Sequence, residues 1–306
     1  MFYPKKTRGR SDLYPFFHIF VEESPDFKSF AYRNFMLKVA ETTDIDKRIH
    51  EELEQLEPIT LQQMKEIRLM NRTDTKFVTT KQRLVRLLQL CRGQYFAQFH
   101  CGSRIASYKT TYWDTEGHFY YMQHHDGRAP RQKVRVRTYM DSKDTFLEVK
   151  TKNNHGRTKK KRILVSSQDV KADEIGDSKG VGIMVDDFLG EQVRRSLADI
   201  HPTVQNQFHR ITLVNYGKTE RLTIDFDIMF HNYDTNLEDN TGNLVIVELK
   251  RDGNVYSPIL SLLRELRIKP HGFSKYCIGS VMTNPALKQN LFKPKLRSLR
   301  KISEQI

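Results

Sequence analysis

Alternating polar and apolar residues predict a series of long β-strands in this 306-residue chain. In Lys133–Tyr139 two Val alternate with Lys and Arg, and in Thr145–Lys152 Leu and Val alternate with charged residues. Successive side chains of a strand point to opposite faces, so each of these strands has one apolar face and one charged face. Thr158–Val165 follows as a third strand after Asn153-Asn-His-Gly156, whose composition is typical of a tight turn.

The same alternation predicts further strands, and a 3.6-residue periodicity predicts helices between them. The further strands are Asp74–Val78, Ser107–Trp113, Thr203–Val214, Leu222–Phe230, Asn243–Lys250 and Lys275–Met282. The predicted helices are residues 45–56, Gln82–Cys91, Thr115–His125, Asp186–Leu197 and Ser257–Leu266. Long strands joined mostly by short turns predict an α+β fold built on a closed antiparallel sheet, with helices packed on its outside.

The two ends of the chain differ in composition from its middle. We expect residues 1–56 to form a basic and helical N-terminal appendage, residues 57–284 to form the strand-rich domain, and residues 285–306 to form a basic C-terminal tail. The chain is long enough to bury a large apolar core.

Neither a membrane span nor a disulfide framework is indicated. No apolar run approaches the ~20 residues that a membrane helix requires. The basic start and the apolar segment Tyr14–Val21 loosely resemble a secretory signal, but a proline and a histidine interrupt the apolar run. Cys91, Cys101 and Cys277 have no CxxC spacing, which argues against a zinc site. We therefore expect a cytoplasmic protein with reduced thiols and no membrane insertion.

Positive charge is concentrated in one part of the chain. The net charge is +14 and the isoelectric point is about 9.6. Between Lys133 and Arg162 there are eleven Lys/Arg and three Asp/Glu, a local excess of +8. A solvated strand face is the ordinary explanation for such charge. The alternation recurs in Arg221–Asp227 and Leu244–Lys250, however, which favours a closed sheet with a cationic lumen that binds a polyanion.

Carboxylates within this cationic pattern are a second informative feature. Glu148 and Glu248 each alternate with Lys on a strand face, where they form local ion pairs or hold a divalent cation. Asp225 and Asp227 share a face and could assist a metal, cap a turn or pair with Arg221. The sequence has no Gly-rich phosphate loop, Ser/His/Asp set or zinc spacing, and its basic segments lack the interleaved aromatics that stack single-stranded bases.

An ordered series of short motifs resembles a known family. The motifs are Met70–Phe77, Tyr112–Thr115, Gly127-Arg, Lys133–Tyr139, Phe146–Lys150, Asn153–Thr158, Arg221–Asp225, Val247–Lys250 and Gly272–Tyr276. Together they resemble the polyphosphate polymerase domain of the vacuolar transporter chaperone (VTC) family, in its bacterial single-domain form, over residues 58–283. That family belongs to the triphosphate tunnel metalloenzymes, the CYTH-like superfamily.

The resemblance implies a closed, eight-stranded antiparallel β-barrel that binds triphosphate and polyphosphate in its tunnel and uses Mn²⁺ or Mg²⁺. By matched position, Glu248 would hold the metal. The catalytic residues that it implies are Lys76, Arg135, Arg137, Lys150 and Glu248, and the further phosphate-binding residues are Lys160, Arg210, Arg221, Lys250 and Lys275.

Two departures from the family pattern bear on activity. Hydrolases of the superfamily carry a Glu-x-Glu-x-Lys strand where this chain has Arg72, Asp74 and Lys76, and the loss of both glutamates favours the polymerase branch. Gln205 stands where the eukaryotic polymerases have an additional Arg. The resulting hypothesis is transfer of the ATP γ-phosphoryl group to a growing polyphosphate chain. The alternatives are a tripolyphosphatase or nucleoside triphosphatase of the same fold, and a non-catalytic module that binds polyphosphate or RNA.

ATP and inorganic polyphosphate are the ligands that this hypothesis requires. A narrow cationic lumen excludes a nucleic acid duplex, so nucleic acid is not the expected partner. By analogy with the eukaryotic complex, a membrane-protein partner could hold the chain at the inner face of a membrane.

Overall fold

The computed structural model of the protein describes residues 44–65, 67, 72–165, 183–193, 195, 199–253 and 255–305. The chain divides into two units after Asp46, and the second unit, residues 47–306, contains the β-sheet. Most of the predicted N-terminal appendage, residues 1–56, lies outside the described residues. After a helical stretch at residues 44–54, the helices are α2 (Leu61–Lys65), α3 (Lys81–Cys91), α4 (Phe119–His125), α5 (Ile183–Gln192), α6 (Pro258–Glu265), α7 (Lys275–Thr283) and α8 (Lys293–Ser303).

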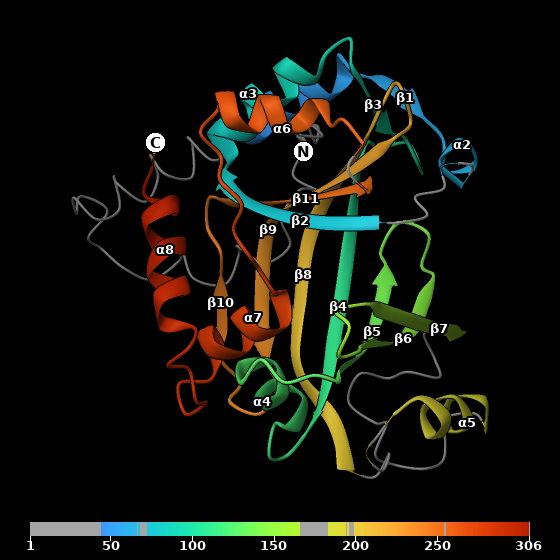
Figure 1. Ribbon diagram of the computed structural model, residues 1–306, viewed down its shortest axis with the longest axis vertical. Helices are drawn as coiled ribbons and strands as arrows, with labels where there is room; N and C mark the ends of the chain where they lie inside the picture. Colours follow the sequence, from blue (N-terminus) through green and yellow to red (C-terminus); the bar gives the residue numbers. More distant parts are fainter. Residues whose placement is uncertain are drawn as a thin grey trace, which may run out of the picture. The chain divides into compact units, whose positions relative to one another are not determined.

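One large sheet organises this unit (Figure 1). Its main path is antiparallel and runs in the order β2-β11-β9-β8-β4-β5-β6-β7, while β10 pairs with β9, and β3 pairs with β8 and, in parallel, with β1. The strands are β1 (Glu57–Ile59), β2 (Arg72–Thr80), β3 (Tyr95–Gln98), β4 (Ile105–Thr115), β5 (Arg131–Tyr139), β6 (Thr145–Lys152), β7 (Thr158–Val165), β8 (Ile200–Asn215), β9 (Glu220–Asn232), β10 (Glu238–Asn240) and β11 (Leu244–Asp252).

The predicted α+β class with a large antiparallel sheet is confirmed. The main path has the eight strands that the resemblance implies. Among the described residues no strand pairing joins β7 to β2, so hydrogen bonding does not close the sheet into a barrel. Within the same residues, no helix combines the length and the apolarity needed to cross a membrane.

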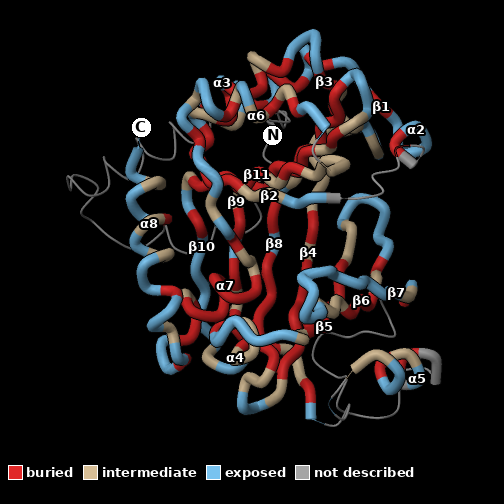
Figure 2. Tube along the Cα trace, in the orientation of Figure 1, coloured by how far each residue is buried: buried red, intermediate tan, exposed pale blue. Residues whose placement is uncertain are grey.

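Most strands lie where the alternation predicts them. β6 and β7 have the predicted bounds, and the turn between them is closed by the Asn153 side chain, whose Oδ1 accepts from the Arg157 N–H at 2.9 Å. Gly156 in this turn has φ 76°, a conformation that glycine adopts at little cost. The central strands β9, β8 and β4 are longer than predicted and are buried over much of their length (Figure 2).

The predicted strand Lys275–Met282 is wrong, because this segment forms helix α7. Ser274 caps the helix, since its Oγ accepts from the Cys277 N–H at 3.3 Å. Residues 276–281 are all buried, so the segment has no polar stripe from which a helical period could be recognised. α7 packs against β8 and β9.

The face of the sheet beneath α7 changes from apolar to charged along β2 and β11. Val78 and Ile246 belong to an apolar cluster that also contains Ile278 of α7. Because alternate residues of a strand share a face, Lys76 and Glu248 continue the same face beyond this cluster. α8 also packs on β2 and β11, so α7 and α8 cover the apolar part of the face and the charged part follows it.

The opposite face of β5 and β6 is apolar, as the alternation predicts. Val134, Val136, Leu147 and Val149 form a buried cluster with Val185 and Leu189 of α5. The charged residues that alternate with them therefore point to the other side of the sheet.

Close packing of α7 on β9 leads to a stability prediction. A Cβ added at Gly279 would lie 2.5 Å from Cδ1 of Phe230. Gly279→Ala should therefore lower the free energy of unfolding by about 1–3 kcal/mol, although Ala is the better helix former by about 1 kcal/mol. The control is Gly190→Ala in α5, where an added Cβ meets no atom within 4 Å and stability should stay equal or rise. Chemical denaturation measures both, and a stable Gly279→Ala protein would contradict this packing.

Candidate functional site

Charged side chains from seven strands and from the first residue of α7 meet on the face described above. Ion pairs and mutual electrostatic effects join them across the sheet. The residues are Lys76 of β2, Glu248 and Lys250 of β11, Asp225 of β9, Arg210 of β8, Arg135 and Arg137 of β5, Glu148 and Lys150 of β6, Lys160 of β7 and Lys275 of α7.

Glu148 is the carboxylate on the β5–β7 side of this group. Nε of Arg135 donates to its Oε2 at 2.7 Å, and Nζ of Lys160 donates to its Oε1 at 2.9 Å. Burial alone would raise the pKa of Glu148, but the charges of Arg135 and then Arg137 hold it below its ordinary value. Glu148 is therefore ionised and compensates cations on its two neighbouring strands, β5 and β7.

Asp225 has the same role on the β8–β9 side. Arg210, its direct cross-strand neighbour, forms two bonds with it, Nε to Oδ1 at 2.5 Å and Nη2 to Oδ2 at 2.7 Å. Lys275 donates to the same Oδ2. Burial would raise the pKa of Asp225, but Arg210 and Lys275 lower it. Burial lowers the pKa of Lys275 to about 8.

Glu248 connects β2 and β11. Its Oε1 lies 2.9 Å from Nζ of Lys76 and its Oε2 lies 2.8 Å from Nζ of Lys250. Nζ of Lys250 also donates to Thr223 Oγ1 at 3.2 Å. Burial would raise the pKa of Glu248, but the charges of Lys250 and Lys76 hold it below its usual range.

Lys150 lacks the compensation that the other lysines have. It has no hydrogen bond or ion pair with any residue that the structure describes, and its cross-strand neighbours are Lys133 and Lys160. The charge of Arg135, then burial, then the charge of Arg137 lower the pKa of Lys150 to about 6. A negatively charged ligand at this position would relieve the repulsion among these groups.

Two stacked aromatic rings support the arginines. The rings of Tyr108 and Phe208 lie 5.2 Å apart at 6°. Arg137 lies 5.5 Å and Arg210 lies 5.0 Å from the Tyr108 ring, and Lys275 lies 4.2 Å from the Phe208 ring. Neither ring was predicted from the sequence, although Phe208-x-Arg210 has the spacing of residues on one strand face.

A buried carboxylate outside the charged face positions α7. Asp114 accepts from the Tyr276 hydroxyl and, at 2.8 Å each, from the Tyr120 and Tyr121 N–H groups at the start of α4. Lys133 donates to Ser274 Oγ at 3.0 Å. These contacts fix the first turn of α7 and hence Lys275. Asp114 belongs to the motif Tyr112–Thr115, but its partner Tyr276 could not be inferred from the sequence.

Two residues differ from the expected arrangement. Arg221 is the cross-strand neighbour of Lys250, but its Nη2 donates to the Met64 carbonyl at 3.3 Å, which turns the guanidinium toward α2. Asp227 does not act with Asp225. It has φ 51° at a register shift between β8 and β9, and it forms an ion pair with Lys81 at 2.6 Å.

The number and exposure of the carboxylates determine how this site could bind a metal ion. Among the described residues no cluster of three or more His, Cys, Asp or Glu could hold a metal ion. Glu148 and Asp225 are almost fully buried between cations, whereas the Glu248 side chain is 20% exposed. A site with one carboxylate fits Mg²⁺ or Mn²⁺ when phosphate oxygens and water supply the other ligands.

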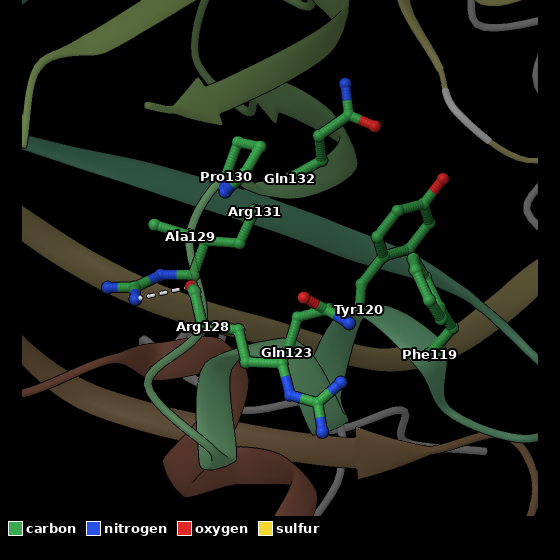
Figure 3. Close-up of a pocket in the computed structure, with 8 residues that line it drawn as sticks. All are labelled: Phe119, Tyr120, Gln123, Arg128, Ala129, Pro130, Arg131 and Gln132. Atoms are coloured by element: carbon green, nitrogen blue, oxygen red, sulfur yellow. Dashed lines mark hydrogen bonds between the residues drawn. The ribbon is translucent and has the colours of Figure 1, made fainter. Parts of the chain in front are cut away.

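Two cavities lie away from the charged residues of this site. One of about 320 Å³ is lined by Phe119, Tyr120, Gln123 and residues 128–132, next to the start of β5 (Figure 3). A second, of about 420 Å³, lies between β10, α7 and α8. Neither is lined by the predicted site residues, so charge rather than cavity shape identifies the site.

The low pKa of Lys150 predicts proton uptake when a phosphate ligand binds. The ligand's charge raises that pKa, so near pH 7 the amine changes from largely neutral to charged and takes up about one proton at most. In the Lys150→Arg protein the guanidinium is charged with or without ligand, so this protein should not take up the proton that the Lys150 amine takes up on binding. Calorimetry of tripolyphosphate binding in buffers of different ionisation enthalpy measures the difference, and equal uptake by both proteins would contradict it.

Removing the Glu148 carboxylate should destabilise the fold. Glu148→Gln leaves Arg135 without its buried partner, for which we expect a loss of about 3–5 kcal/mol. Glu54→Gln is the control, because Glu54 is 65% exposed and pairs with Arg104, and its loss should cost under about 1 kcal/mol. Urea denaturation measures both. Tripolyphosphate should stabilise Glu148→Gln more than the native protein, because its charge substitutes for the carboxylate.

Comparisons with known proteins place this chain in a family. The VTC domain matches residues 71–284. None of the curated proteins matches the sequence. A solved structure from Bacillus halodurans, named as a candidate adenylate cyclase, has 14% identity and a TM-score of 0.44, covering 67% of this chain and 96% of that one. A candidate adenylyl cyclase from Hippeastrum, described as having a dominant triphosphatase activity, has 14% identity and a TM-score of 0.45, covering 70% and 97%. The family predicted from the motifs is confirmed: the chain belongs to the VTC domain family.

Proposed function

We propose that the protein is a metal-dependent polyphosphate polymerase, which transfers the γ-phosphoryl group of ATP to the end of a growing polyphosphate chain. Family membership supports a ligand of the triphosphate or polyphosphate class. The observation that carries the proposal is the convergence of cations from β2, β11, β8, β5, β6, β7 and α7 on one face. Such a surface fits a linear chain of phosphates that contacts several strands at once.

The residues divide by role in this proposal. Arg135 and Arg137 present forked guanidinium groups to phosphate oxygens, and Lys76 and Lys150 add point charges beside them. Glu148, Asp225 and the two stacked rings hold the cations in place before the ligand binds, which lowers the cost of ordering them. The remaining phosphate contacts in the proposal are Lys160, Arg210, Lys250 and Lys275, whereas Arg221 is left out because its guanidinium turns toward Met64.

A tunnel is part of the proposal. β7 and β2 are the two ends of the main path of the sheet. We propose that the sheet curves so that these strands enclose the phosphate chain between them. An enclosed path open at both ends would keep the reacting phosphates dry and let the product leave along its axis.

Phosphoryl transfer in this site needs no protein nucleophile. A terminal oxygen of the polyphosphate chain forms a bond to the γ-phosphorus of ATP, the bond to the β–γ bridging oxygen breaks, and ADP leaves with the electron pair. The attacking oxygen is already ionised, so no general base is required. The residues align the two reactants and neutralise the charge on the equatorial oxygens, which is the main requirement of this reaction. Mn²⁺ or Mg²⁺ held by Glu248 would supply further charge neutralisation when bound.

The proposed ligands follow from the same chemistry, whereas the location rests on other grounds. ATP and inorganic polyphosphate are the partners, with nucleic acid disfavoured. A cytoplasmic location remains a prediction from the cysteine usage, and a membrane-protein partner at the inner face of a membrane remains a prediction from the family analogy. The domain bounds 57–284 also remain a prediction, and the match to the VTC domain lies within them.

Purified protein with ATP and Mn²⁺ should form an acid-labile phosphate polymer with ADP as the other product. Glu248→Gln should lower the rate by about 10²-fold or more, because it removes the metal-binding charge. Glu238→Gln is the control, since Glu238 is 74% exposed on β10, and it should leave the rate unchanged. Polymer length on urea gels and circular dichroism measure activity and fold.

Two results would contradict the polymerase. Metal-dependent release of free phosphate without polymer would identify a hydrolase of the same fold. Tight, salt-sensitive binding of polyphosphate without turnover, and unchanged in Glu248→Gln, would identify a binding module.

A further inference from the structure

Helix α8 carries positive charge without compensation. It contains Lys293, Lys295, Arg297, Arg300 and Lys301, and has no Asp or Glu between its ends. Among the residues that the structure describes, none of these five cations forms an ion pair. Like charges one turn apart on a helix repel one another and destabilise it. The arrangement therefore has a cost that an anionic ligand would remove.

The apolar side of α8 packs against the core of the protein. Leu299 is buried, and Leu296 and Ile302 pack against the apolar cluster that contains Ile278 of α7. The exposed side carries Lys293, Arg297, Arg300 and Lys301, here called the α8 basic surface. At 3.6 residues per turn, Lys293, Arg297 and Lys301 follow one another along this side.

The N-terminal half of α8 adjoins the candidate site. The Lys295 ammonium lies beside Gly272, 3.6 Å from the position that a Cβ would take there. The preceding residue, His271, donates its backbone N–H to the carbonyl of Lys76 at 2.8 Å. Lys275 follows three residues after Gly272. In Figure 1 this segment passes β2 on its way to α7. The segment 271–275 therefore lies between α8 and two cations of the site, Lys76 and Lys275.

The chemistry of the surface selects its partner. A helix that binds a membrane inserts its apolar face, which here is buried in the protein. A surface for single-stranded nucleic acid presents aromatic rings to the bases, and the α8 basic surface has none. What is left is a row of flexible cations, which fits a polyanion with closely spaced charges and no bases.

We infer that the α8 basic surface binds the part of a long inorganic polyphosphate chain that extends out of the site. The identity of the ligand rests on the proposed function, whereas the surface itself does not. Because the site and the surface hold one chain, the second contact is intramolecular and affinity increases with chain length. A triphosphate is too short to reach α8 and gains nothing from it.

The test compares a long polyphosphate of about 100 phosphates with tripolyphosphate as ligands, by calorimetry or fluorescence anisotropy. The surface variant combines Lys293→Gln, Arg297→Gln, Arg300→Gln and Lys301→Gln. It should bind the long chain about tenfold more weakly and with a smaller salt dependence. Its affinity for tripolyphosphate should stay within about twofold, which also shows that the site is folded.

A control variant removes the same charge from four exposed cations outside α8: Lys47→Gln, Arg86→Gln, Lys218→Gln and Arg264→Gln. It should keep its affinity for the long chain. If both variants lost the same affinity for the long chain, the loss would come from net charge alone, and the inference would be overturned. A native protein that binds both ligands equally, or one whose α8 basic surface binds RNA or anionic lipid vesicles more tightly than polyphosphate, would also overturn it.

The experiments distinguish a failure of the α8 basic surface from a failure of the proposed polymerase function. A protein that makes no polymer but loses long-chain affinity in the surface variant would reject the polymerase and keep the surface. Conversely, a polymerase whose long-chain affinity and product length do not change in that variant would keep the function and reject the surface.

Discussion

The whole site depends on the neutralisation of like charges brought together on one face of a sheet. Cations from neighbouring strands repel one another, and burial adds a desolvation cost to each. Three carboxylates offset this, because Glu148, Asp225 and Glu248 each bind two cations from different elements. Each carboxylate therefore links separate elements and fixes the positions of their side chains at the same time. Without these links, the strands could not present their cations at fixed distances.

The neutralisation of positive charge is incomplete at Lys150, and an anionic ligand would complete it. Lys150 lies between Lys133 and Lys160 without a carboxylate of its own, and its lowered pKa records the repulsion from Arg135 and Arg137. A phosphate chain supplies the negative charge that the protein does not. Binding energy then comes from relief of repulsion as well as from new contacts. Charge positioned in advance of the ligand is also what phosphoryl transfer requires.

The division of the face into an apolar and a charged part explains how the helices contribute. α7 packs on β8 and β9 and α8 packs on β2 and β11, and each helix places a cation at the border of the charged part. Lys275 enters the site from the first residue of α7, and Lys295 of α8 lies beside Gly272, just before that helix. The apolar packing thus positions the charged groups, and the same contacts that stabilise the fold orient the site.

The sequence by itself determined the eight strands of the main path of the sheet and the charged faces of β5, β6 and β11, because the two-residue period is a local property of the chain. It also determined the family, and it selected residues such as Arg135 and Glu248 that the structure brings together. It did not predict the short strands β1, β3 and β10. It could not determine that Lys275–Met282 is a helix, because a segment buried on all sides has no polar stripe. Nor could it find the bulge at Asp227, the rings beneath the arginines, or the turn of Arg221 toward Met64. The tertiary structure decided these features, because each depends on which distant strands and helices become neighbours.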